Sequence, residues 1–272
     1  MTFLKTHVRR AVYVAGLARR WFQIRAFLAS MTGRPQAAVV EARDGIPIPP
    51  IDLVNVTSGY TDSNVFLLGG ERSAAALDAA ATRNGLPFSA AGRILDFGCG
   101  VGRIIRHLPA RTNARLSGVD YNPAVVAWCA RNLPGDFRRN ALHPPLDVED
   151  AAVDIIYLVS VFTHLRIATQ DEWLAEFRRV IRPGGLALIT FHDEDHPELA
   201  NTGLTPAALM AVGAHVREDY AEGTNLIGVF QSREFAARRF GAFFDVAEII
   251  PSTSSGVGQA LAVLRRLETP ES

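Results

Sequence analysis

Short apolar runs alternate with amphipathic stretches through most of the chain. Runs of strand character occupy residues 94–97, 114–119, 137–140, 153–160 and 186–191. Apolar residues at helical spacing occupy 65–84, 101–108, 122–133, 169–180 and 232–240. Such regular alternation predicts an α/β protein whose parallel sheet is covered by helices on both faces. The last two strands, 244–250 and 259–264, have no helix between them and predict an antiparallel hairpin across the loop 252–258.

Capping and turn residues set several boundaries. Asn122 and Pro123 suit the N-cap and first position of one helix, and Gly85 suits the end of another. Thr169 and Glu172 form a capping box. The run 182–185 predicts a turn before the fifth strand.

Residues 193–232 break the rhythm. A helix from Thr205-Pro206 to Val216 is expected there, followed by a polar, glycine-containing stretch. An insertion at this point of an open α/β sheet lies over the carboxyl ends of the strands, where ligands bind. We therefore expect a lid that selects the substrate.

The chain divides into three parts. Residues 1–52 are a basic N-terminal helical arm with a Pro-rich linker, 53–267 form the main domain, and 268–272 are a tail. Within residues 1–30 there are six basic and no acidic residues among apolar ones. This pattern fits peripheral membrane or partner contact, or an arm packed on its own domain.

Composition narrows the function. The 272 residues are 48% hydrophobic and carry no formal net charge, which gives no argument for a nucleic-acid partner. The two cysteines, Cys99 and Cys129, do not suggest disulfides. Since no apolar run approaches 18 residues, no membrane span is expected, and the chain fits a reducing cytoplasm.

The strongest signal for a ligand-binding site is a turn that contains three glycines. Gly98, Gly100 and Gly102 follow the strand at 94–97 and precede a helical pattern. Glycine permits positive φ and close ligand approach, and a helix N-terminus attracts negative groups. A dinucleotide fingerprint would need its third glycine at Arg103, so a nicotinamide oxidoreductase is disfavoured. Asp120, which ends the next strand, can hold both hydroxyls of a ribose.

The run from Leu95 to Gly102, together with Asp120, resembles the class I S-adenosylmethionine-dependent methyltransferases. The stretch 178–186 is similar to the family segment leading into the fifth strand. The resemblance covers 85–267, and more weakly 54–84. It implies a Rossmann-like seven-stranded sheet, mostly parallel with an antiparallel last strand. It also implies S-adenosyl-L-methionine as cofactor and S-adenosyl-L-homocysteine as product.

The resemblance also assigns cofactor contacts. The backbone of the glycine turn would approach the cofactor. Asp96 would bind its amino-acid end, and Asp120 would bind the ribose. The adenine would be contacted by Tyr121, Asn140 and Ala141. Ser160 and Val161 would line the central pocket, Tyr60 would cover the methionine end, and Arg103 would face the methionine carboxylate or a substrate anion. Alternatives remain: Asp120 capping a turn, Asn140 as a turn residue, Tyr60 packed in the core, and Arg103 on a solvated face.

His164, just after the fourth strand, is the candidate catalytic base, since histidine titrates in the right range. The alternative is a structural histidine that holds its loop. The run from His192 to His196 offers two imidazoles and three carboxylates. Because consecutive side chains cannot all converge, a solvated acidic loop is favoured over a metal site.

These features predict methyl transfer from S-adenosylmethionine to a small-molecule or glycan acceptor, at a hydroxyl oxygen. The alternatives are N-methylation of a small amine and a non-catalytic cofactor-binding scaffold. The tetrapeptide typical of enzymes that methylate base amines is missing after the fourth strand, where Ser160–Thr163 stand.

Overall fold

The computed structural model describes residues 45–59, 62–217, 222–224 and 227–267. The predictions for the basic arm, for Tyr60 and for the tail 268–272 concern residues outside this described part.

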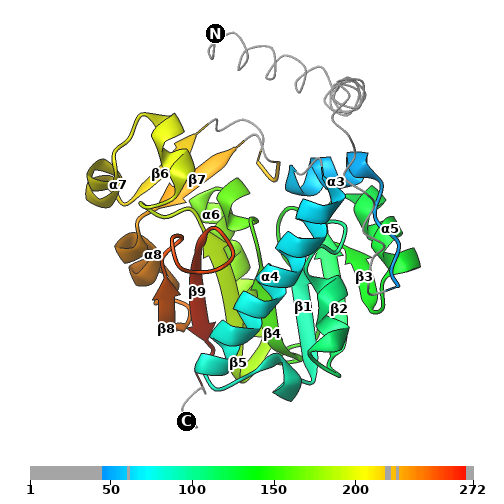
Figure 1. Cartoon of the computed structure of the whole chain (residues 1–272). Coiled ribbons are helices and arrows are strands. Elements are labelled where there is room, and N and C mark those ends of the chain that lie inside the picture. The colour runs from blue at the N-terminus through cyan, green and yellow to red at the C-terminus, as the bar shows by residue number, and fades with distance from the viewer. Residues whose placement is uncertain (1–44, 60–61, 218–221, 225–226, 268–272) are drawn as a thin grey trace, which may run out of the picture.

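Seven strands form the main sheet, in the order β3-β2-β1-β4-β5-β9-β8 (Figure 1). Their bounds are β1 (Arg93–Phe97), β2 (Arg115–Asp120), β3 (Asp136–Arg139), β4 (Val153–Leu158), β5 (Ile181–Phe191), β8 (Asp245–Ile250) and β9 (Ala260–Arg265). The first five strands pair in parallel, whereas β9 runs antiparallel to both β5 and β8. The predicted mostly parallel sheet with a reversed last strand is confirmed.

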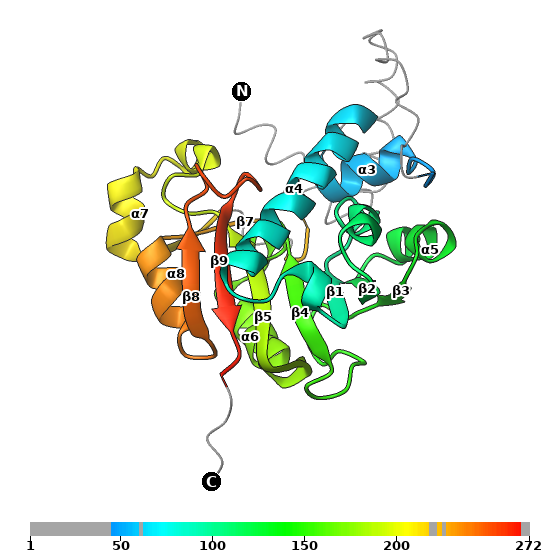
Figure 2. The same cartoon turned by 60° about the horizontal axis from the view of Figure 1, so that its bottom comes forward.

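Helices cover both faces of the sheet (Figure 2). Alternate strand residues face opposite sides, so Ile94 and Tyr157 join one core while Leu95 and Ile156 join the other. The first core includes α4 (Ser63–Arg83) and α5 (Pro123–Asn132), and the second includes α6 (Ile167–Val180) and α8 (Arg233–Phe240). The candidate site lies at the carboxyl edge of the sheet, between these two layers of helices.

Two of the predicted caps are confirmed. The Asn122 side chain accepts a hydrogen bond from the Ala124 N–H at the start of α5. Gly85 follows α4 at φ +77°, and the N–H of Leu86 returns to the Ala81 carbonyl. At its other end α4 is capped by Asp62.

The helix predicted over 101–108 is wrong. Turns follow the glycines, and a 3₁₀ helix, η2 (Ile105–Ala110), takes its place. Pro109 lies inside this segment, where it has no N–H to donate and its ring opposes an α-helical turn. The dipole of a full α-helix therefore does not face the glycine turn.

The predicted capping box is also wrong, because α6 begins at Ile167 and places Thr169 inside the helix, buried. The Glu222 carboxylate accepts from the Arg166 N–H instead. The expected turn at 182–185 lies within β5, whose register against β4 shifts there. Residues 51–52, expected in the linker, begin a short helix, α3 (Ile51–Ser58).

The insertion differs most from expectation. Its helix α7 (Pro206–Val212) ends at Gly213, which has φ +83°. The chain then forms β6 (Ala214–Arg217), which pairs antiparallel with β7 (Gly228–Gln231). The second half of the predicted helix is thus a strand of a separate two-stranded sheet (Figure 1).

Gly70 of α4 provides a test of how this helix packs on the glycine turn. A Cβ at Gly70 would lie 2.0 Å from the Arg103 carbonyl oxygen. Gly→Ala inside a helix normally stabilises by about 0.5–1 kcal/mol. We expect Gly70→Ala to destabilise instead, by about 1–3 kcal/mol, because backbone atoms must separate. Urea unfolding measures the change in the free energy of unfolding, with Leu68→Ala on the exposed face of α4 as the control. A Gly70→Ala variant that is more stable than wild type would contradict this packing.

Candidate active site

The glycine turn joins β1 to η2. Gly98, Gly100 and Gly102 all have positive φ, at 75°, 53° and 73°. A Cβ at Gly98 would come within 2.4 Å of the Val161 side chain, and one at Gly102 within 2.1 Å of the Leu133 side chain. Backbone conformation and internal packing therefore require glycine at both positions, in addition to any approach of a ligand.

Asp120 connects this turn to the end of β2. Its Oδ2 accepts from the Gly100 N–H at 3.0 Å, and its Oδ1 accepts from the Asn122 N–H at 2.8 Å. Burial raises the pKa of this carboxyl, while the two N–H groups oppose the rise. Asp120 does cap a turn, and each oxygen still has a second lone pair for a ligand hydroxyl.

The predicted adenine contacts lie beside Asp120. The Asn140 N–H donates to the Asp120 carbonyl at 3.2 Å, and Tyr121 is exposed. The Asn140 amide donates to the Ala141 carbonyl at 2.7 Å. Asn140 Oδ1 is buried and has no hydrogen-bond partner within the described part of the chain. An exocyclic amine is a donor of the kind that this oxygen requires.

Asp96 is buried beneath the turn. The Tyr157 hydroxyl donates to Asp96 Oδ2 at 2.8 Å, from the register position directly opposite on β4. Burial raises the pKa of Asp96 to about 7, although Tyr157 and Arg103 both lower it. Arg103 donates to Ser73 on α4 at 3.2 Å, so it does not lie on a solvated face. Sequence reasoning missed Tyr157 as a partner of Asp96 because Tyr157 continues an apolar run. The signal that could have found it is the polar hydroxyl of a tyrosine inside a buried strand.

Ser160 and Val161 follow β4. Ser160 has φ +63°, and its N–H donates to Thr190 Oγ1 at 2.8 Å. Gln259 bonds to both of these residues, through its carbonyl oxygen to Thr190 and its amide nitrogen to Ser160. Sequence reasoning missed Thr190 and Gln259, which are brought together only by the β5–β9 pairing.

His164 lies in η3 (Phe162–His164), beneath the insertion. Its Nδ1 is 2.9 Å from the Ile227 carbonyl, so Nδ1 carries the hydrogen and Nε2 keeps a lone pair. Burial lowers the pKa of His164, which keeps the ring neutral at pH 7. The buried Gln170 holds this turn by donating to the Phe162 and Leu165 carbonyls, each at 2.7 Å.

The acidic run after β5 is not the solvated loop that was expected. Asp193 and Glu194 are buried. The Arg233 guanidinium pairs with the carboxylates of Asp193, Glu194 and Asp195, at 2.7, 3.0 and 2.5 Å respectively. Within the described residues no group of three or more His, Cys, Asp or Glu side chains could hold a metal ion. The carboxylates thus fix the start of α8.

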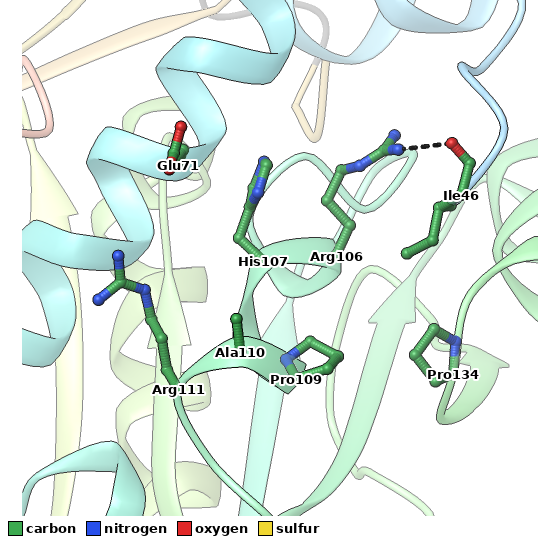
Figure 3. A pocket seen from close by; sticks show the side chains of 8 residues that line it. All are labelled: Ile46, Glu71, Arg106, His107, Pro109, Ala110, Arg111 and Pro134. Atoms are coloured by element: carbon green, nitrogen blue, oxygen red, sulfur yellow. Dashed lines mark hydrogen bonds between the residues drawn. The ribbon is translucent and has the colours of Figure 1, made fainter. Parts of the chain in front are cut away.

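A cavity of about 620 Å³ lies against η2 (Figure 3). Its lining residues are Ile46, Glu71, Arg106, His107, Pro109, Ala110, Arg111 and Pro134. The Arg106 guanidinium is buried and donates to the Ile46 carbonyl at 2.9 Å. None of these residues belongs to the candidate site.

Comparison with known proteins agrees with the geometry. Residues 95–189 match a family model described as a methyltransferase domain. A 101-residue stretch, 37% of the chain, is 36% identical to a probable S-adenosylmethionine-dependent methyltransferase of Mycolicibacterium smegmatis. The aligned stretches span 38% to 45% of the lengths of the curated relatives matched.

Solved structures show the same fold. A methyltransferase from Methanosarcina mazei aligns with a TM-score of 0.52 at 17% identity, covering 69% of this chain and 97% of its own. The Burkholderia thailandensis 1,6-didemethyltoxoflavin-N1-methyltransferase, with bound S-adenosylhomocysteine, aligns with a TM-score of 0.54 at 18% identity. That alignment covers 78% of this chain and 85% of the other.

The glycine turn, the acidic residue ending β2 and the sheet order thus define a class of nucleotide-like cofactor sites. Over residues 95–189 the chain is similar to methyltransferase domains, and a stretch of it is similar to a probable S-adenosylmethionine-dependent methyltransferase, in agreement with the resemblance seen in the sequence. The hydrogen-bond acceptors present fit S-adenosylmethionine: buried carboxylates at Asp96 and Asp120, and an Asn140 oxygen that has no hydrogen-bond partner among the described residues. Among the described helices, none has the length and apolar character needed to cross a membrane.

The raised pKa of Asp96 predicts that both the stability of the protein and its affinity for the cofactor depend on pH. Its pKa is about 7 in the native state against an ordinary 3.8, so the native protein holds this proton more tightly than the unfolded chain. The stability that this proton contributes is complete below about pH 4 and is lost as pH rises through about 7. Asp96→Asn, which stays uncharged, should therefore melt at a higher temperature than wild type at pH 8, but not at pH 4.

The resemblance assigns Asp96 to the amino-acid end of the cofactor, so we expect the same substitution to weaken S-adenosylhomocysteine binding by about tenfold or more, as loss of a charged hydrogen bond would. Wild-type affinity should fall as pH falls through 7. Asp147→Asn, at a highly exposed carboxylate, is the control. An Asp96→Asn variant that is destabilised at pH 8, or that binds unchanged, contradicts this account of the site.

Proposed function

We propose that the protein transfers a methyl group from S-adenosylmethionine to a hydroxyl oxygen of a small-molecule or glycan acceptor, with His164 as base. The observation that supports this most is the fixed tautomer of His164. Its Nδ1–H is held by the Ile227 carbonyl, and the neutral ring therefore offers Nε2 as a proton acceptor.

In this proposal the two carboxylates bind opposite ends of the cofactor. Asp120 accepts from the ribose hydroxyls, and Asp96 accepts from the ammonium of the methionine end. Tyr121, Asn140 and Ala141 contact the adenine. Ser160 and Val161 line the space between the cofactor and the acceptor, and Arg103 supports the charge of Asp96.

When bound, S-adenosylmethionine supplies a methyl group on a positively charged sulfur, which leaves as a neutral thioether. The task of the protein would be to hold the acceptor oxygen in position to attack that methyl group. His164 Nε2 takes the hydroxyl proton as the oxygen lone pair forms the new bond. Gln170 keeps the His164 turn in place, and the β6–β7 sheet covers it through Ile227.

Two other functions use the same site. An amine acceptor would also need to lose a proton, and the Burkholderia thailandensis neighbour is named as an N-methyltransferase. A non-catalytic scaffold would bind the cofactor without turnover. A panel of hydroxylated aromatics, sugars and primary amines, assayed with methyl-labelled cofactor, separates the three functions. Label on a hydroxyl compound indicates O-methylation, label on an amine indicates N-methylation, and no labelled product indicates a scaffold.

His164→Asn tests the role of the base. Asparagine keeps a donor at the Nδ1 position for the Ile227 carbonyl but removes the Nε2 lone pair. We expect kcat to fall by about 10²–10⁴ with S-adenosylhomocysteine affinity unchanged.

His143→Asn is the matched control, because His143 is an exposed histidine that pairs with Glu172. A His164→Asn variant with wild-type turnover would make His164 a structural residue and remove the base from the proposal.

A further inference from the structure

A chain of hydrogen bonds beside the candidate site fixes the orientation of the Gln259 amide. Thr190 is fully buried, and its Oγ1 already accepts from the Ser160 N–H. Its hydroxyl hydrogen needs an acceptor, and Gln259 Oε1 lies 2.7 Å away. With the amide reversed, this hydrogen would have no acceptor among the contacts of the described residues. The amide nitrogen of Gln259 therefore points the other way.

This orientation fixes the tautomer of His192. Gln259 Nε2 donates to Ser160 Oγ at 3.0 Å and to His192 Nε2 at 3.3 Å. A neutral imidazole that accepts at Nε2 carries its hydrogen on Nδ1. Burial, with His196, His164 and Arg217 nearby, lowers the pKa of His192 to about 2, so the ring is neutral.

The Nδ1–H of His192 is a donor without an acceptor. His192 is only 6% exposed, and Nδ1 is buried with no hydrogen-bond partner in the described part of the chain. Its ring stacks on His196 at 3.9 Å between centroids and lies 5.0 Å from Phe230. A buried donor left unpaired costs stability, so a persistent one calls for a ligand or a water.

The position of His192 places this donor at the acceptor end of the site. His192 follows β5 directly, and His164 follows β4, which pairs in parallel with β5. The two imidazoles therefore lie at the same carboxyl edge, and Phe230 of the insertion sheet packs against His192. Arg217, a charged group close enough to lower the pKa of His192, pairs with Glu198 at 3.6 Å.

We propose that His192 binds the methyl acceptor through its Nδ1–H, at an oxygen atom next to the reacting hydroxyl. The inference rests on the proposed function and narrows its substrate to compounds with two neighbouring oxygens, such as vicinal diols and catechols. A donor on the reacting oxygen itself would hold the lone pair that must attack, so a neighbouring oxygen is the useful target. Because Nδ1 is enclosed, the acceptor reaches it only as the packing against His196 opens.

Two neutral substitutions separate this role from a structural one. His192→Asn places an amide at the Nδ1 position but loses the bond to Gln259. His192→Gln places an amide at the Nε2 position, keeping that bond but losing the Nδ1 donor. Catechol and phenol are the probes, titrated by calorimetry into protein saturated with S-adenosylhomocysteine; phenol lacks the second oxygen.

We expect wild type and His192→Asn to bind catechol about three- to tenfold more tightly than phenol, as one hydrogen bond provides. His192→Gln should bind the two alike. Catechol-bound wild type should also show a shifted His192 Nδ1 resonance in ¹⁵N spectra.

The opposite order, with His192→Gln retaining the preference and His192→Asn losing it, would make His192 a structural part of the Gln259 network. Absence of catechol binding by wild type, or equal binding of catechol and phenol, would overturn the inference. Loss of S-adenosylhomocysteine binding itself would instead reject the proposed function, so the two failures are distinguishable.

Discussion

The two hydrogen bonds of the Asp120 carboxylate hold the candidate site together. One oxygen binds the Gly100 N–H and the other binds the Asn122 N–H, so a single side chain links the turn after β1 to the start of α5. The N–H groups of Gly98 and Cys99 add two bonds to the Val119 carbonyl, at 2.8 and 3.0 Å. Since α4 packs against the same turn through Gly70, its position depends on this link as well.

The site has two halves with different electrostatics. In the first, two buried carboxylates, Asp96 and Asp120, have raised pKa values because burial disfavours their charge. A cationic ligand end would restore that charge, so cofactor binding and deprotonation should be coupled. In the second half, His164 and His192 are neutral and are fixed in defined tautomers by the Ile227 carbonyl and by Gln259.

The features that the sequence predicted correctly are those that depend on residues close together along the chain. The glycine turn, the Asn122 cap and the strand pattern depend on neighbouring residues, and the structure has all three. The α-helix expected over 101–108 is absent because Gly102, inside that range, has φ +73° and Pro109 follows directly. The strand β6 was missed because its pairing partner, β7, lies beyond residues 218–226.

Contacts between distant segments could not be predicted from spacing. Tyr157 meets Asp96 across 61 positions, and Gln259 meets Ser160 across 99. Arg233, which gathers the acidic run after β5, lies 40 positions beyond Asp193. In each case the sequence shows a polar residue beside or within an apolar run, but only the folded sheet supplies the partner.

The central claim is that Asp120 and the glycine turn form a cofactor site. Calorimetric titration with S-adenosylhomocysteine tests it most directly, comparing wild type with Asp120→Asn and with Asp245→Asn, at an exposed carboxylate on the edge strand β8. We predict binding by wild type and Asp245→Asn, and affinity lower by about tenfold or more in Asp120→Asn, since a charge-assisted hydrogen bond is lost. Folded wild type that does not bind, or Asp120→Asn that binds as tightly as wild type, would contradict the claim.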